Sequence, residues 1–466
     1  MKKILYSIMI ITLFSCQERR VTLGTIASEE SAGSFAKASR LIDWYIAENK
    51  LSEQEIYDLN FRKDVMKRIE LDFNKTKDDV IAYVKKYYPD VNEEMLNKWI
   101  SDGSLESIII NGERKFFDRS APNLFRINKE AGQRKREVDG KPVTDAKTLF
   151  LQKDIPEILA GKSNPVTVKF KYTVTLKPDV VPNNEVIRCW LPYPDENCKR
   201  QSEIKLLKAN GDNCIISPKE YAHRTLYMEK TAKKGEPVVF QIEFSYLSKS
   251  QYLKFQGISE DEFKENISER PPHIVFSDII KELSTQIIGD ETKPYQKVRK
   301  IFTYIDENYP WAGAREYSTI SNIPEYVIKN GHGDCGQKTL LLITLLRYNG
   351  IPARWESGFM VHPNAVNLHD WGAYFIEDSG WIPVDQSFGI NEWAANEQEK
   401  YFYMNGTDAY HFVVNTDYSQ TLYPEKIYPR SETIDFQRGE LEWRGGNLYF
   451  DKWDWDIEVS YVYGQL

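Results

Sequence analysis

Three residues, Cys335, His369 and Asp385, have the types and the order that nucleophilic catalysis requires. A cysteine thiolate attacks a carbonyl carbon, and a neighbouring imidazole takes the thiol proton. A carboxylate that accepts the other imidazole N–H fixes its tautomer and stabilises the imidazolium. We therefore expect a covalent acyl transfer in which these residues act as nucleophile, base and orienting group.

The segment around Cys335 predicts that the thiol lies at the start of a helix. Residues 331–336 are rich in glycine, and the run from Thr339 to Tyr348 has apolar residues at helical spacing. The unpaired amides and partial positive charge of a helix N-terminus favour a thiolate. We expect this helix to point into the protein core.

His369 and Asp385 are predicted to lie at neighbouring ends of a β-hairpin. Strand-like segments, 371–376 and 381–384, flank a polar turn at 377–380. Because successive side chains of a strand alternate between faces, we expect Asp370 on the face opposite His369. The remaining histidines near these motifs are interpreted as structural: His332, His362 and His411.

Together these motifs resemble the transglutaminase-like core, over about residues 275–395. The motifs are Gly-Asp-Cys opening a helix, Gly-Ile-Pro-Ala-Arg after it, His-Asp-Trp on one strand and Trp-x-Pro-Val-Asp on the next. The resemblance implies a papain-like α+β fold and gives Cys335, His369 and Asp385 their roles. It also places Trp311 near the oxyanion, either as an indole N–H donor or as a residue packed in the cleft wall.

The rest of the chain predicts a multidomain α+β protein in which a helical module and an antiparallel β-sandwich precede the papain/transglutaminase-like core. Helical spacing dominates the first unit, which also contains an Asn111-Gly112 turn. Apolar residues alternate without a break over 166–176 and again over 238–246, as in half-buried strands. The expected units are 1–16 signal peptide, 17–30 tether, 31–127 helical module, 128–158 linker, 159–252 β-sandwich, 253–398 catalytic core and 399–466 aromatic-rich β extension packed on the core.

The N-terminus resembles a bacterial lipoprotein signal. Lys2 and Lys3 precede an apolar stretch, Ile4–Phe14, that is shorter than the roughly 20 residues needed to span a bilayer. Cys16 follows, in the position of the cysteine that is lipidated in such signals. We expect an exported protein of the cell envelope, anchored by a lipid on Cys16 on the periplasmic or outer-membrane side.

Charge and cysteine content exclude several other classes of function. A net charge of −8 argues against nucleic-acid binding, which requires a basic face. The spacing of cysteine and histidine fits no structural zinc site, and we expect no metal and no cofactor. Cys198 and Cys214 lie in loop-like sequence of an exported protein and are a candidate disulfide.

The predicted substrate is a peptide or protein amide, and three outcomes stay open. If water resolves the thioester on Cys335, the protein is a cysteine peptidase or amidase, which is the outcome we expect. If a lysine amine resolves it, the protein is a crosslinking transglutaminase. The third outcome is a catalytically inactive binding or scaffold protein of the cell surface. The N-terminal helices could also cover the active site.

Overall fold

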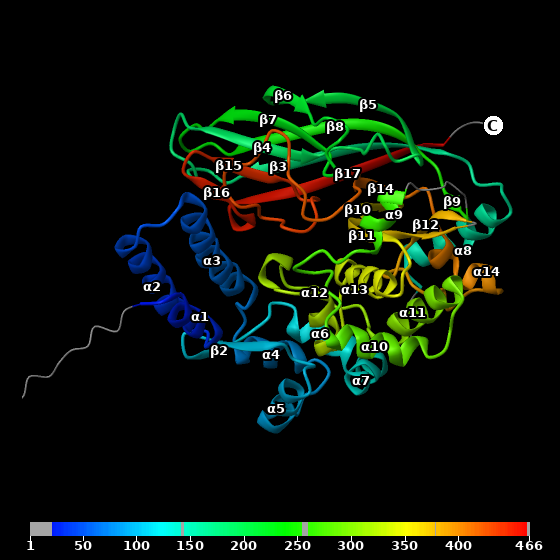
Figure 1. Ribbon diagram of the computed structural model, residues 1–466, viewed down its shortest axis with the longest axis horizontal. Helices are drawn as coiled ribbons and strands as arrows, with labels where there is room; N and C mark the ends of the chain where they lie inside the picture. Colours follow the sequence, from blue (N-terminus) through cyan, green and yellow to red (C-terminus); the bar gives the residue numbers. More distant parts are fainter. Residues whose placement is uncertain (1–20, 141–143, 254–259, 378, 464–466) are drawn as a thin grey trace, which may run out of the picture.

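The computed structural model describes residues 21–140, 144–253, 260–377 and 379–463. The expected signal peptide, with Cys16, lies outside these residues. Helices account for 37% of the structure and strands for 27%, so the predicted α+β class is confirmed. Figure 1 shows a layer of strands at the top of the view and a layer of helices below it, with the blue N-terminal helices at one side. Within the described ranges, no helix is both long and apolar enough to cross a membrane.

The N-terminal module is helical and carries the predicted hairpin. Asn111 and Gly112 form its turn, both with positive φ (50° and 88°). Part of the expected tether is folded, because Thr22 caps a helix that buries Ile26. The elements of this module are α1 (Leu23–Ser31), α2 (Phe35–Glu48), α3 (Glu53–Asp72), α4 (Lys77–Val84), α5 (Glu93–Ser101), β1 (Ser107–Ile110), β2 (Glu113–Phe116) and α6 (Ser120–Ile127).

The segment expected to be a linker, 128–158, is also mostly helical. It contains α7 (Lys129–Asp139) and α8 (Ala146–Leu159), each opened by a side-chain cap. Helix α8 buries Ile155 and two neighbouring apolar residues in a cluster with Phe402, so it packs on the predicted core. The charged sequence of α7 favours a linker, whereas the apolar residues of α8 become a recognisable core only through contact with distant residues such as Phe402.

Two antiparallel sheets form the predicted β-sandwich. In β3 every second residue is buried, as its alternating sequence predicts. One sheet has the order β17 (Trp453–Tyr463), β3 (Val166–Leu176), β8 (Val238–Ser248), β5 (Gln201–Ala209). The other has the order β16 (Gly446–Leu448), β15 (Glu440–Trp443), β4 (Val186–Pro192), β7 (Thr225–Thr231), β6 (Asp212–Ile216).

The unit predicted to be the core is a four-stranded antiparallel sheet packed against helices. Its strand order is β12 (Gly380–Val384), β11 (Ala365–Ile376), β10 (Ala353–His362), β14 (His411–Asn415). The helices are α9 (Glu260–Ile267), α10 (Asp278–Ile288), α11 (Pro294–Asn308), α12 (Ile323–Asn330) and α13 (Cys335–Tyr348). Shorter elements complete the fold: β9 (Gln251–Tyr252), η1 (Tyr317–Thr319), α14 (Glu397–Lys400), α15 (Phe402–Asn405), β13 (Gly406–Thr407) and η2 (Phe450–Lys452).

The C-terminal segment, 399–466, is more than an extension on the core. Strand β14 is an edge strand of the four-stranded core sheet, whereas β15, β16 and β17 complete the two sheets of the sandwich. The red strand β17 therefore lies beside the much earlier β3 in Figure 1. Phe412 on β14 stacks on Tyr246 of the sandwich, with ring centroids 4.7 Å apart, so the two units share one apolar core.

The candidate disulfide is not formed. Cys198 and Cys214 are both free thiols. Cys214 lies on β6, at the edge of one sheet of the sandwich, whereas Cys198 precedes β5, at the edge of the other sheet. The two strands belong to opposite layers, which sequence spacing alone cannot reveal.

Candidate active site

Helix α13 begins with Cys335, as the sequence predicts. Asp334 caps the helix: its side chain accepts the backbone N–H of Gln337 at 3.0 Å, and the Gln337 side chain accepts the N–H of Asp334 at 3.2 Å. Gly336 is required, since an added Cβ would lie 2.4 Å from Tyr317 Oη and 2.6 Å from Asp370 Oδ2. Residues 336–347 are buried, so the thiol is held on a rigid element.

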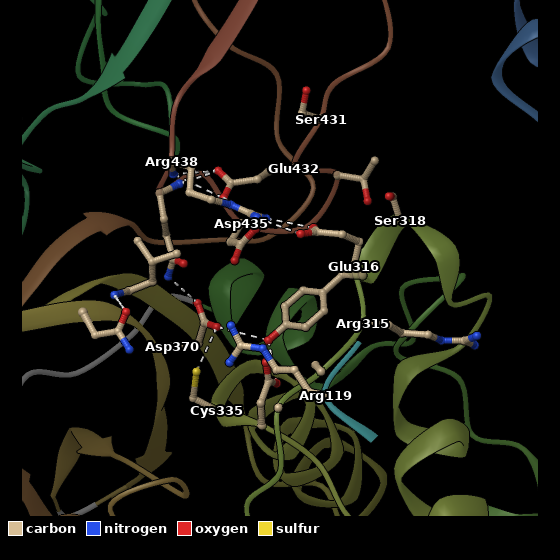
Figure 2. Close-up of a pocket in the computed structure, with 18 of the residues that line it drawn as sticks. Arg119, Arg315, Glu316, Ser318, Cys335, Asp370, Ser431, Glu432, Asp435 and Arg438 are labelled. Carbon is tan, nitrogen blue, oxygen red and sulfur yellow. Dashed lines mark hydrogen bonds and ion pairs between the residues drawn. The ribbon is translucent and has the colours of Figure 1, made fainter. Parts of the chain in front are cut away.

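Cys335 lines a cavity of about 380 Å³. Its other walls are the loop before α12, the start of strand β11 and a loop between β14 and β15 (Figure 2). The N-terminal module contributes Arg119 to the lining, so this module helps to enclose the cavity. Trp311 also lines the cavity, and the Arg126 guanidinium lies 4.5 Å from its ring centroid. Its role as an oxyanion donor stays a prediction.

The hydrogen-bond partner of the Cys335 thiol is Asp370. The thiol donates to Asp370 Oδ2 over a distance of 3.4 Å, as Figure 2 shows. Burial, Asp370 and Asp334 raise the pKa of the thiol well above its ordinary value. Burial and Asp334 also raise the pKa of Asp370 well above the usual range for a carboxyl group. The thiol is therefore protonated at neutral pH in this arrangement.

His369 and Asp385 form the second half of the predicted site. His369 Nε2 lies 2.6 Å from Asp385 Oδ2, and His369 is 3% exposed. Asp385 Oδ1 accepts the backbone N–H groups of Ser387 and Phe388 at 2.8 and 2.9 Å. The hairpin of β11 and β12 thus brings imidazole and carboxylate together, as expected.

The thiol and this histidine are not in hydrogen-bond contact. His369 and Asp370 are consecutive residues of β11, so their side chains point to opposite faces of the sheet. Asp370 faces helix α13 and Cys335. His369 packs on the other face, with ring centroids 5.6 Å from Trp371 and 5.4 Å from His411. The structure therefore contains two half-sites that are separated by one strand.

On the His369 face, imidazoles and carboxylates alternate in a buried chain. Asp385 Oδ2 also lies 2.9 Å from His411 Nε2. His411 Nδ1 lies 3.0 Å from Asp408 Oδ1, and Asp408 Oδ2 lies 2.9 Å from His362 Nε2. The sequence interpretation treated His362 and His411 as structural and missed their link to Asp385. Separate strands and loops supply them, so no local motif marks the chain.

The contacts of His411 define its protonation state. Both of its ring nitrogens face carboxylates, and only an imidazolium can donate to both. Burial lowers the pKa of His411, but Asp408 and Asp385 outweigh it and raise the pKa to about 9. Burial would raise the pKa of Asp385, but His369 and His411 hold it well below its ordinary value. His369 is neutral because burial lowers its pKa, so its Nε2 carries the hydrogen and its Nδ1 is basic.

Comparisons with known proteins agree with the core motifs. A model of the transglutaminase-like superfamily matches residues 281–386, which include Cys335, His369 and Asp385. A structure of a proposed cysteine protease from Cytophaga hutchinsonii is similar, with a TM-score of 0.42, 15% identity and coverage of 65% of this chain and 92% of that chain. The periplasmic domain of TgpA from Pseudomonas aeruginosa has a TM-score of 0.28 and 12% identity, covering 50% of this chain and 91% of that one. No curated protein matches the sequence. The protein thus carries a domain of the transglutaminase-like superfamily at residues 281–386.

Proposed function

We propose that this chain is a thiol hydrolase that cleaves peptide or protein amides through an acyl intermediate on Cys335. The observation that carries the proposal is the position of Cys335, the first residue of a buried helix and part of a cavity wall. The thiol is protonated at rest, and the helix N-terminus stabilises the negative charge that develops on sulfur during attack. The backbone N–H of Cys335 is a donor for the oxyanion that forms on the substrate carbonyl.

The proposed reaction has two halves. First, His369 Nδ1 takes the thiol proton, Sγ bonds to the carbonyl carbon, and the C–N bond breaks as the imidazolium protonates the departing amine. Then His369 takes a proton from water, the oxygen attacks the thioester carbon, and the C–S bond breaks as the thiolate regains the proton. One water is consumed, and one amine and one carboxylic acid are formed.

The buried chain supports His369 as the base. Asp385 holds the hydrogen on Nε2, which leaves the Nδ1 lone pair available. Within the described residues, no hydrogen bond to Nδ1 competes for that lone pair. Because His369 lies on the opposite face of β11, attack requires a movement of this strand that brings the imidazole to the thiol in place of Asp370. We assign the Cys335–Asp370 contact to the resting enzyme and the Cys335–His369 contact to the substrate complex.

A peptide-library assay tests this function. The wild type and Cys335→Ala are incubated with a mixed peptide library, with and without an added primary amine, and products are read by mass spectrometry. Cleavage that depends on Cys335 supports the hydrolase. Incorporation of the amine would instead indicate a transglutaminase. If a folded sample gives neither product, the protein is a binding or scaffold protein and the proposal fails.

We also propose that the protein is exported and anchored through Cys16. The support is in the sequence: a basic start, a short apolar stretch and a cysteine directly after it. Expression of the full chain in a bacterium, with mass spectrometry of the mature N-terminus, tests the proposal. A diacylglyceryl group on Cys16 that is lost in Cys16→Ala supports it. An intact Met1, or cleavage without lipid, contradicts it.

A further inference from the structure

The cavity beside Cys335 is acidic, and its carboxylates are not fully balanced by cations. Lysine and histidine are absent from the lining residues that the structure describes. The lining carboxylates are Asp334, Asp370, Glu316, Glu432 and Asp435, and the lining guanidinium groups are Arg119, Arg315 and Arg438. The balance therefore depends on where each guanidinium group points.

Two of the three arginines already have carboxylate partners: Arg438 pairs with two lining glutamates, and Arg315 lies near a glutamate outside the lining. Arg438 bonds to both oxygens of Glu316 at 2.7 and 2.8 Å and to Glu432 at 2.7 Å. Arg315 lies over the ring of Tyr326, 5.0 Å from its centroid, and 3.9 Å from Glu106. Among the described lining residues, Arg119 partly offsets Asp334, and Arg438 partly offsets Asp435 without bonding to it.

Asp435 is the carboxylate that is left without a partner. It is 7% exposed and lines the cavity, where Figure 2 shows it between Glu316 and Asp370. Among the described residues, nothing donates a hydrogen bond to its side chain or forms an ion pair with it. Burial, Glu432 and Asp370 raise its pKa well above the usual range. A buried acid group that faces an open cavity and lacks a hydrogen-bond donor is a place where a ligand can supply that donor.

A cationic ligand would compensate the excess of carboxyl groups over guanidinium groups in the cavity lining. Carboxylates that burial and like charges hold protonated become ionised when an opposite charge arrives within about 4–6 Å. The indole of Trp455, partly exposed on the same lining, offers an aromatic face for a cation. A metal ion is a poorer fit. In the described chain, the two groups of potential metal ligands both belong to the buried histidine chain and not to this cavity.

We propose that the cavity binds an ammonium or guanidinium group of the substrate between Asp370 and Asp435, so that the enzyme selects amides beside a Lys-like or Arg-like side chain. The selectivity for amides rests on the proposed hydrolase function, whereas the cation site does not. The bound cation also takes Asp370 as its own hydrogen-bond partner, in competition with the Cys335 thiol. Substrate binding therefore assists the exchange of the thiol from Asp370 to His369.

Alkylation of Cys335 by probes of different charge tests the site without any assay of hydrolysis. The full chain is treated separately with 2-bromoethylamine, iodoacetamide and iodoacetate, and modification of Cys335 is measured by peptide mass spectrometry. The exposed Cys214 is the internal reference thiol. We expect the ratio of Cys335 to Cys214 modification to be of the order of tenfold higher for the cationic probe than for the neutral one. The anionic probe should give the lowest ratio.

Asp435→Asn should reduce that cation preference severalfold while leaving the Cys214 rates unchanged. The amide replaces a carboxyl group that is already protonated in the empty cavity, so folding should be retained. Asp290→Asn is the matched control, because it removes one charge from an exposed residue outside the cavity. Equal preference in wild type and Asp435→Asn, or no preference in the wild type, would overturn the cation site. Protection of Cys335 by calcium ions but not by ethylamine would also overturn it, in favour of a metal.

Defined peptides then connect the site to substrate choice. Peptides of the form acetyl-Ala-Ala-X-Ala-Ala-amide are compared, where X is lysine, arginine, citrulline or norleucine. The proposal expects cleavage beside lysine or arginine and a severalfold loss of that preference in Asp435→Asn. Cleavage beside neutral residues with an intact alkylation preference would retain the cation site but exclude the substrate class. A cation preference in alkylation with no peptide cleavage would contradict the hydrolase function but not the cation site.

Discussion

Buried acid groups have different partners on the two faces of strand β11. On one face, His369 begins a chain in which every carboxylate accepts hydrogen bonds from imidazoles. On the other face, Asp370 accepts hydrogen bonds only from neutral groups among the described residues, including the Cys335 thiol and the Gln437 amide, and Asp435 has no donor. Burial is similar on both faces, so the presence of cationic partners makes the difference. The histidine face is a hydrogen-bonded scaffold with paired charges, whereas the cavity face leaves acid groups available to a ligand.

The same contrast appears in the pKa values. On the histidine face, imidazoles overcome burial and keep Asp385 and Asp408 ionised. On the cavity face, burial and neighbouring carboxylates keep Asp370 and Asp435 protonated, and burial raises the pKa of Asp334 to about 6. Deleting a group on the first face leaves a buried charge unpaired. Deleting one on the second face removes a repulsion.

The largest expected effect separates the two faces by activity. His369→Gln removes the proposed base, so kcat/KM for a cleaved peptide should fall by about a thousandfold. Asp370→Asn removes a group that raises the thiol pKa and one side of the proposed cation site, so it should keep kcat, raise KM for lysine and arginine peptides, and alkylate faster with iodoacetamide at pH 7. Steady-state kinetics and alkylation rates of Cys335 measure both effects. The reverse pattern, in which Asp370→Asn is inactive and His369→Gln active, would assign the base to Asp370.

The next effect concerns stability. Asp408→Asn removes one of the two carboxylates that pair with the buried imidazolium of His411. Breaking a buried ion pair from one side destabilises a protein by about 3–5 kcal/mol, so the free energy of unfolding in urea should fall by about that amount. Asp435→Asn is the matched change on the cavity face and should be neutral or slightly stabilising. Similar losses of unfolding free energy in Asp408→Asn and Asp435→Asn would show that the two faces do not differ in how they stabilise buried acid groups.

A smaller effect should appear in the pH dependence of stability. The pKa of His411 is raised to about 9 in the folded protein, against about 6.5 in an unfolded chain. Its contribution is therefore complete below pH 6.5 and is lost as the pH rises to 9, by about 3 kcal/mol. Several other groups titrate nearby, so the measurement is the difference in unfolding free energy between wild type and His411→Gln. A difference that stays constant from pH 6.5 to 9 would exclude the imidazolium, as would NMR of a neutral His411 ring at pH 7.

Much of the scaffold could be predicted from the sequence. The alternation over 166–176 and 238–246 identifies β3 and β8, and the apolar run after Cys335 identifies α13. The hairpin that joins His369 to Asp385 also follows from local pattern. These elements depend on residues near one another in the chain, where periodicity and turn residues act directly.

The remaining features depend on contacts between distant segments. Strands β15 to β17 complete a sandwich that begins nearly three hundred residues earlier, and no local signal specifies such pairing. Strand alternation places Asp370 opposite His369, as predicted. It cannot indicate which face α13 covers, and so the partner of the thiol was not predictable. Asp408 and His411 likewise join the site only through the three-dimensional fold.

The smallest expected effect compares two tyrosines, one on each face, that each donate a hydrogen bond to an aspartate. Tyr403 Oη donates to Asp408 Oδ2 at 2.8 Å, and Tyr317 Oη donates to Asp334 Oδ1 at 2.7 Å. Asp408 is ionised and enclosed, so Tyr403→Phe should cost about 2–3 kcal/mol, as hydrogen bonds to charged groups do. Asp334 lines the open cavity and has a pKa of about 6, so water can replace the lost donor and Tyr317→Phe should cost about 1 kcal/mol. Urea unfolding at pH 7 measures both. Equal costs would mean that the cavity is as dry and as fixed as the histidine chain, and the contrast between the two faces would then lie in charge alone.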